Sequence, residues 1–510
     1  MREFNTSGPC DPKLHYTVLR EELLKVGQNM VEKGKYFTIW APRQAGKTTY
    51  FKLLIEEINK GSEYFALWIS FEGSRSISSK EKFYNSLKIS IFDEINQKVI
   101  KNFIEEFALK DEKDLFYLFR DIYNNFKQKL VLVIDEVEGC PEAAISDLMH
   151  TFREMYHKKH LHALQSLILV GVSNISGIIM DYASPFNIAD ELTIPYFTEA
   201  EVADLINQYE VESKQGFSSK VKQKIFQDTA GQPGLVCGMC KDLVEKFCPD
   251  KTRSITLKDY WKCLDYYLRE KIDKNISNIV SKAKKEKELM LKILFTEEVL
   301  YTIDDERMTY LLVNGVIARS REYIDIPVPL YKKRLITAFR PLFNGEGEYY
   351  PGIKEDFNRF YTKAGINIEL LLDNYQAYIR KRGFRAFDVK NLKESAWHYS
   401  LDGYLYFFIE RLGGKVLVEV PTGRGRVDIL ILYKNEEYVI ETKRYTDNFY
   451  YQKGKRQLME YLKNEGLSEG YYVVFSNVHE DEDILKEKEE IERKIINSYI
   501  IRTNIKSPTK

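Results

Sequence analysis

The stretch YFTIWAPRQAGKTTYFKLL, residues 36–54, consists of an apolar run, a loop rich in small residues and a run with helical spacing. This order predicts a strand, a loop and a helix. Gly46 lets the loop backbone curl around phosphate oxygens, and the start of the helix directs unpaired N–H groups at the anion. The stretch therefore predicts a phosphate-binding P-loop.

Each residue of this loop has an expected role in binding ATP. The spacing Ala41-x4-Gly46-Lys47-Thr48 fits the P-loop pattern, with Ala41 where glycine is usual. We expect Lys47 to reach the β- and γ-phosphates and the Thr48 hydroxyl to ligate Mg²⁺. Thr49 completes the predicted nucleotide-binding set.

A second motif, LVLVIDE at residues 130–136, strengthens this interpretation. It is an apolar strand that ends in two acids, of which Asp135 is expected to hold Mg²⁺ and Glu136 to polarise the attacking water. A buried strand followed by an exposed acidic turn would have the same sequence pattern. Because this motif follows the P-loop motif in the expected order, a nucleotide site is favoured. A later strand ends in Ser173 and Asn174, which are either a γ-phosphate sensor or a plain strand end.

Composition excludes several classes of protein. Lys plus Arg (76) equals Asp plus Glu (76), so a nucleic-acid site has to be a local patch. No apolar run reaches the ~18 residues of a membrane helix, and the polar start MREFNTSGPC lacks a signal-peptide core. A cytoplasmic protein is therefore expected. The cysteines at 237, 240, 248 and 263 are expected to be buried thiols rather than zinc ligands.

The chain divides into several regions by pattern. Residues 30–240 alternate strand-like and helix-like runs, which predicts an α/β multidomain protein with a parallel sheet. Residues 288–335 contain two helical pieces and a hairpin, the pattern of a small winged helix. A last α/β unit begins near Lys393 and ends near Val478. The expected domains are a P-loop core (1–240), a helical lid and winged helix (241–340), a helix-rich linker (341–390) and a C-terminal domain (391–510).

Four segments together resemble the AAA-like ATPases of prokaryotes, relatives of the AAA+ and STAND groups: MREFNTSGPCDPKLHYTV, APRQAGKTT, LVLVIDEVE and GQPGLV. Those ATPases carry a winged helix behind the core, and VNGVIARSREYIDIPVPLYKKRL is similar to it. The resemblance covers residues 1–340. It implies a P-loop NTPase core that binds and hydrolyses ATP with Mg²⁺, and assembly into a homo-oligomer.

The stretch GRGRVDILILYKNEEYVIETKRY, residues 423–445, places charges inside two apolar runs. With a two-residue turn at 435–436, Asp428 faces Lys443, and residues that face each other share one side of the sheet. Asp428, Glu441 and Lys443 then converge. Two carboxylates on one side suit Mg²⁺, or Mn²⁺ in its place, and Lys443 can orient a water. The alternative is a cross-strand charge pair on a solvated face.

Asp428…Glu441-Thr442-Lys443 is similar to the D…E-x-K signature of PD-(D/E)XK nucleases. The expected order of helix, strand, hairpin, helix and strand over residues 394–477 resembles the restriction-endonuclease-like core of that family. The resemblance implies metal-dependent cleavage of nucleic acid, with DNA as the expected substrate.

Two more positions match related nucleases. Gln457, with Tyr461 four residues later, matches the QxxxY motif of RecB-like enzymes and is counted as catalytic. Glu394 lies where related nucleases place a metal-proximal acid, and Glu410 is a second candidate for that role.

The leading interpretation is an ATP-controlled, Mg²⁺-dependent nuclease with a P-loop ATPase, a winged helix and a C-terminal phosphodiesterase. Defence against foreign DNA would suit this architecture. The alternative is a STAND-like switch that uses ATP for assembly. Its C-terminal nuclease fold would then serve as a nucleic-acid-binding or interaction module. Turnover that depends on a metal separates the two interpretations.

Overall fold

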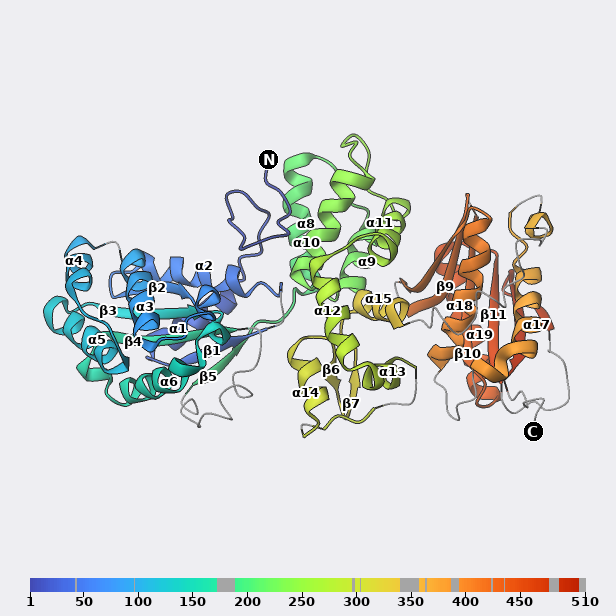
Figure 1. The fold of residues 1–510 in the computed structure, drawn as a ribbon. Helices are drawn as coiled ribbons and strands as arrows, with labels where there is room; N and C mark the ends of the chain where they lie inside the picture. Colours follow the sequence, from blue (N-terminus) through green and yellow to red (C-terminus); the bar gives the residue numbers. More distant parts are fainter. Residues whose placement is uncertain are drawn as a thin grey trace. The chain divides into compact units, whose positions relative to one another are not determined.

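The computed structural model describes residues 1–41, 44–95, 97–171, 189–295, 299–302, 304–339, 357–362, 365–386, 394–422, 425–434, 436–476 and 486–503. The chain forms two compact units (Figure 1). The first comprises residues 1–218, 230–260 and 309–315, and the second residues 219–229, 261–308 and 316–510. Across the described ranges, none of the helices has the length and apolar character needed to cross a membrane.

A five-stranded parallel sheet forms the centre of the first unit. Its order is β2-β3-β4-β1-β5, so β1, which leads into the P-loop, lies between two other strands. The predicted parallel α/β architecture is confirmed for this unit. The strands are β1 (Phe37–Trp40), β2 (Tyr64–Ser70), β3 (Lys129–Asp135), β4 (Leu164–Gly171) and β5 (Asp190–Thr193).

Helices cover both faces of this sheet because β3 is apolar on both sides. Leu130, Leu132 and Ile134 belong to one core, whereas Val131 and Val133 belong to another. A parallel strand buried on both faces has this continuous apolar character. The first core includes α3 (Lys80–Glu94), α4 (Lys98–Glu106), α5 (Glu112–Phe126) and α6 (Glu142–His157), and the second includes α1 (Glu21–Glu32) and α2 (Lys47–Lys60).

Helices and a small hairpin follow the first sheet along the chain. The helix α8 begins with a capping box in which Thr198 and Glu201 bond to each other's backbone. The hairpin of β6 and β7 lies between α14 and α15, in the order predicted for a winged helix, which stays a prediction. The elements are α8 (Glu199–Ser213), α9 (Ser219–Thr229), α10 (Pro233–Asp242), α11 (Leu257–Arg269), α12 (Lys274–Lys285), α13 (Lys287–Phe295), α14 (Glu306–Val313), β6 (Ala318–Ser320), β7 (Tyr323–Asp325) and α15 (Pro329–Phe339).

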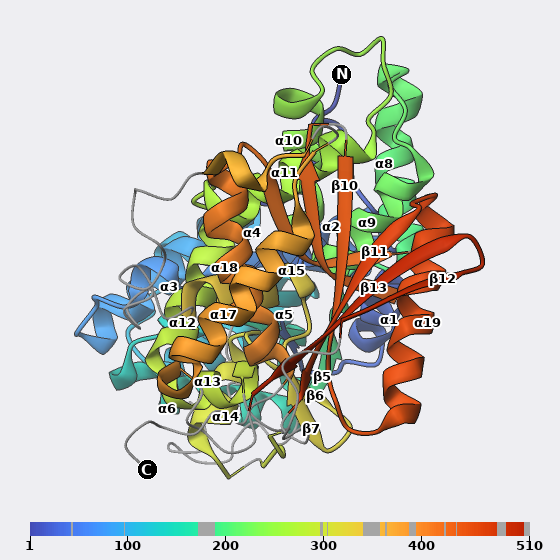
Figure 2. The same ribbon diagram turned by 90° about the vertical axis from the view of Figure 1, so that its right-hand side faces the viewer.

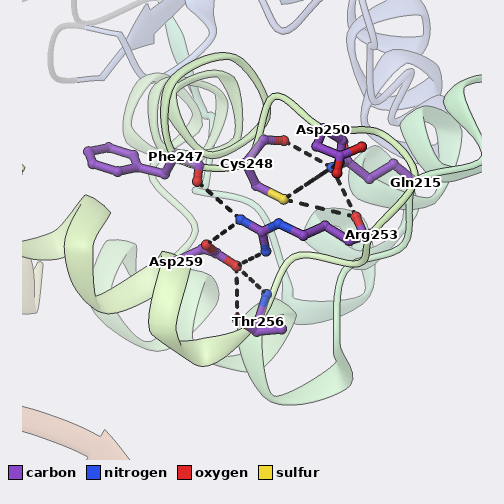
Figure 3. Close-up of polar contacts among 7 residues, drawn as sticks. All are labelled: Gln215, Phe247, Cys248, Asp250, Arg253, Thr256 and Asp259. Carbon is purple, nitrogen blue, oxygen red and sulfur yellow. Dashed lines mark hydrogen bonds and ion pairs between the residues drawn. The ribbon is translucent and has the colours of Figure 1, made fainter. Parts of the chain in front are cut away.

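The loop before α11 is closed by polar contacts (Figure 3). Gln215 Nε2 donates to the carbonyls of Cys248 and Asp250, each at 3.0 Å. The Arg253 guanidinium donates to both oxygens of Asp259, at 2.8 and 2.9 Å. Burial acts to raise the pKa of Asp259, but its hydrogen bonds from Arg253 and Thr256 outweigh burial and lower the pKa to about 2. The carboxylate is thus ionised and holds the loop.

The predicted burial of the cysteines is confirmed. Cys237, Cys240, Cys248 and Cys263 are buried free thiols. Throughout the part of the chain that the structure describes, no group of three or more His, Cys, Asp or Glu side chains is arranged to hold a metal. These thiols therefore serve as small core residues.

A six-stranded mixed sheet is the centre of the C-terminal region, with order β12-β13-β11-β10-β9-β8. The helices α17 and α18 cover one face and α19 covers the other (Figure 2). The order α18, β8, β9, β10, α19, β11 follows the sequence-based expectation. The elements are α17 (Ile368–Ala386), α18 (Glu394–Arg411), β8 (Lys415–Thr422), β9 (Gly425–Tyr433), β10 (Glu436–Arg444), α19 (Asn448–Glu465), β11 (Glu469–Ser476), β12 (Lys486–Ile491) and β13 (Lys494–Arg502).

Two features of this sheet differ from the prediction. Beyond the expected end near Val478, β12 and β13 add an antiparallel pair to the sheet. The pairing of the hairpin also differs from the prediction, because Tyr433 rather than Lys434 is the last residue of β9 to pair, and its partner is Glu436. Lys434 has a φ of 52°, the left-handed conformation that a two-residue hairpin turn requires. The predicted turn at 435–436 is therefore wrong.

The changed pairing alters which residues lie opposite each other, but not which face of the sheet they share. Pairing between β9 and β10 ends at Ile429 with Ile440. Asp428 precedes Ile429 and Glu441 follows Ile440, so Asp428 lies opposite Glu441 rather than opposite Lys443. Each residue of β9 pairs with a residue of β10 that lies two positions earlier than predicted. Because side chains alternate along a strand, a shift of two positions leaves them on the predicted face.

Candidate functional site

The loop between β1 and α2 has the features of an anion site. Gly46, the residue before α2, has a φ of 90°, a conformation that favours glycine, and provides no side-chain cap. The first N–H groups of a helix have no acceptor within the helix, so those of α2 point toward the concave side of the loop. Pro42 and Arg43, in the same loop, lie outside the described residues.

Lys47 lies inside this loop. Its side chain is buried, and Nζ donates to the Ala41 carbonyl oxygen at 2.6 Å. The half-buried Thr48 follows it on α2. The Thr49 hydroxyl accepts a hydrogen bond from the Cys10 N–H at 3.0 Å, which ties the N-terminal segment to the loop. The four predicted residues Ala41, Gly46, Lys47 and Thr48 thus belong to one compact loop and helix start.

The two acids of the second motif lie at the carboxyl end of β3. Asp135 is buried, and its Oδ1 accepts a hydrogen bond from the Glu136 N–H at 3.0 Å. Burial raises the pKa of Asp135 to about 6, whereas the Glu136 N–H and the Lys47 ammonium act to lower it. Glu136 is half-buried with a φ of 51°. A nearby cation would stabilise the ionised form of Asp135, which is the behaviour expected of a Mg²⁺ ligand.

An open pocket of about 140 Å³ adjoins the P-loop. It is lined by the N-terminal segment, the start of α2 and the start of α10, among them Cys10, Tyr16, Gly46, Pro233 and Cys237. Our sequence-based site did not include the N-terminal residues of this wall. In the sequence, only the resemblance of the segment MREFNTSGPCDPKLHYTV to AAA-like ATPases pointed to these residues.

The segment GQPG, residues 231–234, packs against the P-loop. The Gly234 N–H and the Gln232 Nε2 both donate to the Gln44 carbonyl at 3.2 Å. A Cβ atom at Gly234 would lie 2.8 Å from Gln44 Cβ, so a larger residue would push the two segments apart. The start of α10 is therefore fixed to the loop that contains Lys47.

A second cluster lies where β9 and β10 separate. Lys443 Nζ lies 2.9 Å from Glu441 Oε1 and 3.8 Å from Asp428 Oδ2. Glu441 is only 1% exposed. The structure thus brings together the three residues of the predicted D…E-x-K site, at the end of two core strands.

The Asp428 carboxylate is positioned by the residue between Glu441 and Lys443. Thr442 donates to Asp428 Oδ2 from its backbone N–H at 2.6 Å and from its hydroxyl at 2.8 Å. His398 Nδ1 of α18 lies 3.1 Å from the same hydroxyl. Thr442 and His398 were missed because the motif leaves the middle position of E-x-K unspecified.

Other predicted residues have different surroundings. Gln457 is exposed on α19, whereas Tyr461 of the same motif is buried. Glu394 is the first residue of α18, but its side chain, like that of Glu410, lies outside the described residues. The predicted sensor residues Ser173 and Asn174 also lie outside them.

Comparison with known proteins gives two family matches. A family described as "AAA-like domain" matches residues 14–335. A family described as a domain of unknown function, DUF8371, matches residues 367–479 and assigns no activity to the second cluster. No curated protein matches the sequence.

Solved structures give weak likenesses. The Walker-type ATPase PABY2304 of Pyrococcus abyssi is 16% identical, covers 66% of this chain and 99% of its own, and has a TM-score of 0.45. The Thermotoga maritima RuvB Holliday junction branch migration motor is 14% identical over 64% of this chain and 96% of its own, with a TM-score of 0.36. The Aeropyrum pernix ORC1 protein in complex with DNA is 10% identical over 66% of this chain and 94% of its own, with a TM-score of 0.33.

The raised pKa of Asp135 leads to a prediction about stability. The folded protein binds this proton more tightly than the unfolded chain, so the ionised carboxylate destabilises the fold above pH 6. Without nucleotide, Asp135→Asn should increase the free energy of unfolding at pH 8 by about 2 kcal/mol. The gain should shrink as the pH falls from about 6 toward 4. Denaturant unfolding at several pH values measures it, with the exposed Asp204→Asn as control. A gain that grows on acidification would contradict the assignment.

Proposed function

Because the chain belongs to the AAA-like domain family over residues 14–335, we propose that it is a P-loop ATPase whose nucleotide state controls a metal-dependent nuclease at its C-terminal end. The approach of Asp428, Glu441 and Lys443 carries the nuclease half of this proposal. Homo-oligomerisation and a cytoplasmic location remain predictions.

The ATPase half is supported by the P-loop geometry. Lys47 is held inside the loop, where its ammonium can bind the β- and γ-phosphates. Thr48 and Asp135 would hold Mg²⁺, which supplies positive charge that offsets the charge developing on the phosphates. Glu136, half-buried beside Asp135, is positioned to orient and deprotonate the attacking water.

The nuclease half is supported by the cost of burying these charges. Two carboxylates at the end of a hydrophobic sheet repel each other and lose hydration, and a solvated charge pair would have no need for a 1% exposed glutamate. Asp428 and Glu441 would hold a divalent cation, which supplies charge that activates water and neutralises the phosphate. Lys443 lies at the same place and can orient the water or bind a phosphate oxygen.

The exposed side of α19 supports a nucleic-acid substrate. Phe449 is 68% exposed and Tyr450 is 55% exposed, although both are large aromatic residues. Lys453 and Arg456 are exposed on the same helix. Aromatic rings bind unstacked bases and basic side chains bind phosphates, so this surface suits a single-stranded segment of nucleic acid. By contrast, Lys455 is buried against Glu487 and Glu489 and does not add to this surface.

One observation favours a second candidate function. The cluster has two described carboxylates, and Lys443 already lies 2.9 Å from one of them. An ammonium in that position can stabilise Glu441 without a metal. The C-terminal domain would then bind nucleic acid without cutting it, under control of the ATPase.

The first test concerns the ATPase site. Glu136→Gln should slow ATP hydrolysis by at least about 100-fold, because it removes the general base, while nucleotide binding remains. Lys47→Ala should lose both hydrolysis and tight binding, because it removes the charge that offsets the phosphates. Phosphate release and binding of a fluorescent ATP analogue measure the two effects. Hydrolysis at the wild-type rate by Glu136→Gln would show that the base lies elsewhere.

The second test concerns cleavage. Asp428→Asn and Glu441→Gln should each reduce cleavage of plasmid and single-stranded DNA by at least about 100-fold with Mg²⁺ or Mn²⁺. ATP hydrolysis by both variants should match the wild type. If the wild type cuts neither DNA nor RNA with either metal but binds them, the second candidate function replaces the first.

The third test concerns the aromatic surface. Phe449→Ala and Tyr450→Ala should each weaken binding of a single-stranded oligonucleotide by at least about fivefold, because each stacked base contributes about 1–3 kcal/mol. Fluorescence anisotropy in EDTA measures binding without cleavage. Tyr117→Ala, which removes a 43% exposed ring from α5, is the matched control. Unchanged affinity in both test variants would rule out this surface.

A further inference from the structure

The helix α9 ends next to the segment that contacts the P-loop. Only residues 230–232 separate its last residue, Thr229, from the start of α10. Ala230 and Gly231 both have left-handed φ values, 49° and 72°. A Cβ atom at Gly231 would lie 1.9 Å from the Phe197 carbonyl oxygen, so this turn is tightly fixed. Gly234 donates to the Gln44 carbonyl, so only three residues of chain separate α9 from a helix that contacts the P-loop.

Two lysines of α9, Lys220 and Lys224, lie near elements of the C-terminal region. Lys220 Nζ lies 3.1 Å from Glu465 Oε2, at the end of α19. Lys224 is only 6% exposed, and its Nζ lies 4.9 Å from the centre of the Trp261 ring. Burial lowers the pKa of Lys224 to about 8, while Asp228 and Glu465 act to raise it. A lysine this buried is costly unless acidic groups face it.

The acidic partners belong to elements of the second cluster. Glu437, within electrostatic reach of Glu465, Lys220 and Lys224, lies on β10. Side chains alternate along a strand, so Glu437 and Glu441 point to the same side of β10. Glu465 ends α19, the helix that directly follows β10. Lys220 therefore contacts the helix that follows the strand carrying Glu441 and Lys443.

A buried ion pair fixes α9 from the opposite direction. Lys333 Nζ of α15 lies 2.5 Å from Asp228 Oδ1, and both side chains are fully buried. A buried pair that loses one partner is strongly destabilised, because the remaining charge is left without compensation. This pair fixes the position of α9 against α15.

We propose that the basic surface of α9, formed by Lys220 and Lys224, is the interaction surface through which nucleotide at the P-loop controls the C-terminal domain, with Glu437 and Glu465 as its partner. This inference rests on the proposed function and adds the route of its regulation. Charge pairs at such a surface weaken as the charges move apart, because the Coulomb energy falls with distance.

The experiment uses the full chain and measures hydrogen exchange of β10 and α19 with and without a non-hydrolysable ATP analogue and Mg²⁺. In the wild type the analogue should change exchange there by at least about fivefold, the lower range of allosteric coupling. Glu465→Lys and Lys220→Glu should each reduce this change, and the double variant should restore it. Lys224→Met should reduce it while leaving the pair of Lys333 and Asp228 in place.

The controls separate loss of coupling from loss of folding or binding. Glu154→Lys and Lys158→Glu reverse the charges of another exposed ion pair, on α6, and should leave the change in exchange intact. Analogue affinity should be the same in all variants. Because exposed pairs contribute little to stability, the reversals should leave the protein folded.

Each outcome decides between the two proposals. No effect of the bound analogue on β10 and α19, or an undiminished effect in Glu465→Lys and Lys224→Met, overturns the inference. If the exchange effect follows the predicted pattern but no metal supports cleavage, the route of control stands and the nuclease assignment fails. If cleavage occurs at the same rate with and without analogue, regulation by α9 is excluded although the nuclease is real.

Discussion

Two carboxylates in this protein depend on the same interaction, a hydrogen bond from a main-chain N–H at the end of a strand. Asp135 accepts the N–H of Glu136, and Asp428 accepts the N–H of Thr442. A carboxylate removed from water is costly unless such donors replace its hydration. Because Thr442 lies on β10 and Glu136 directly follows β3, both donors are held by strands that are fixed in their sheets, and the carboxylates are fixed too. Both candidate sites therefore owe their geometry to sheet packing rather than to flexible loops.

The parallel sheet and the P-loop could be predicted because their signals are local. Apolar runs on β3 specify burial on both faces, and Gly46 and Lys47 follow β1 at the spacing that phosphate binding requires. The cluster of Asp428, Glu441 and Lys443 was also predicted, although the turn was misplaced. The error moved the register by an even number of positions, so the alternation of side chains preserved the shared face.

What could not be predicted depends on contacts between distant parts of the chain. The tie from Cys10 to Thr49 and the hydrogen bond between His398 and Thr442 join residues far apart in sequence. The strand β12, with sequence KEKEEI, has almost no apolar residues, so hydropathy gives no sign of it. Its place is set by pairing with β13 and by Lys455, which contacts Glu487 and Glu489.

This charged strand has a consequence for assembly. β12 lies at one end of the six-stranded sheet and exposes alternating lysines and glutamates. Adding a strand from a second copy would bring identical rows of charge together and strip them of water, and charged edge strands oppose such pairing. The sheet is therefore blocked from growing on that side. We therefore expect copies of this chain that associate to meet through a surface other than this edge.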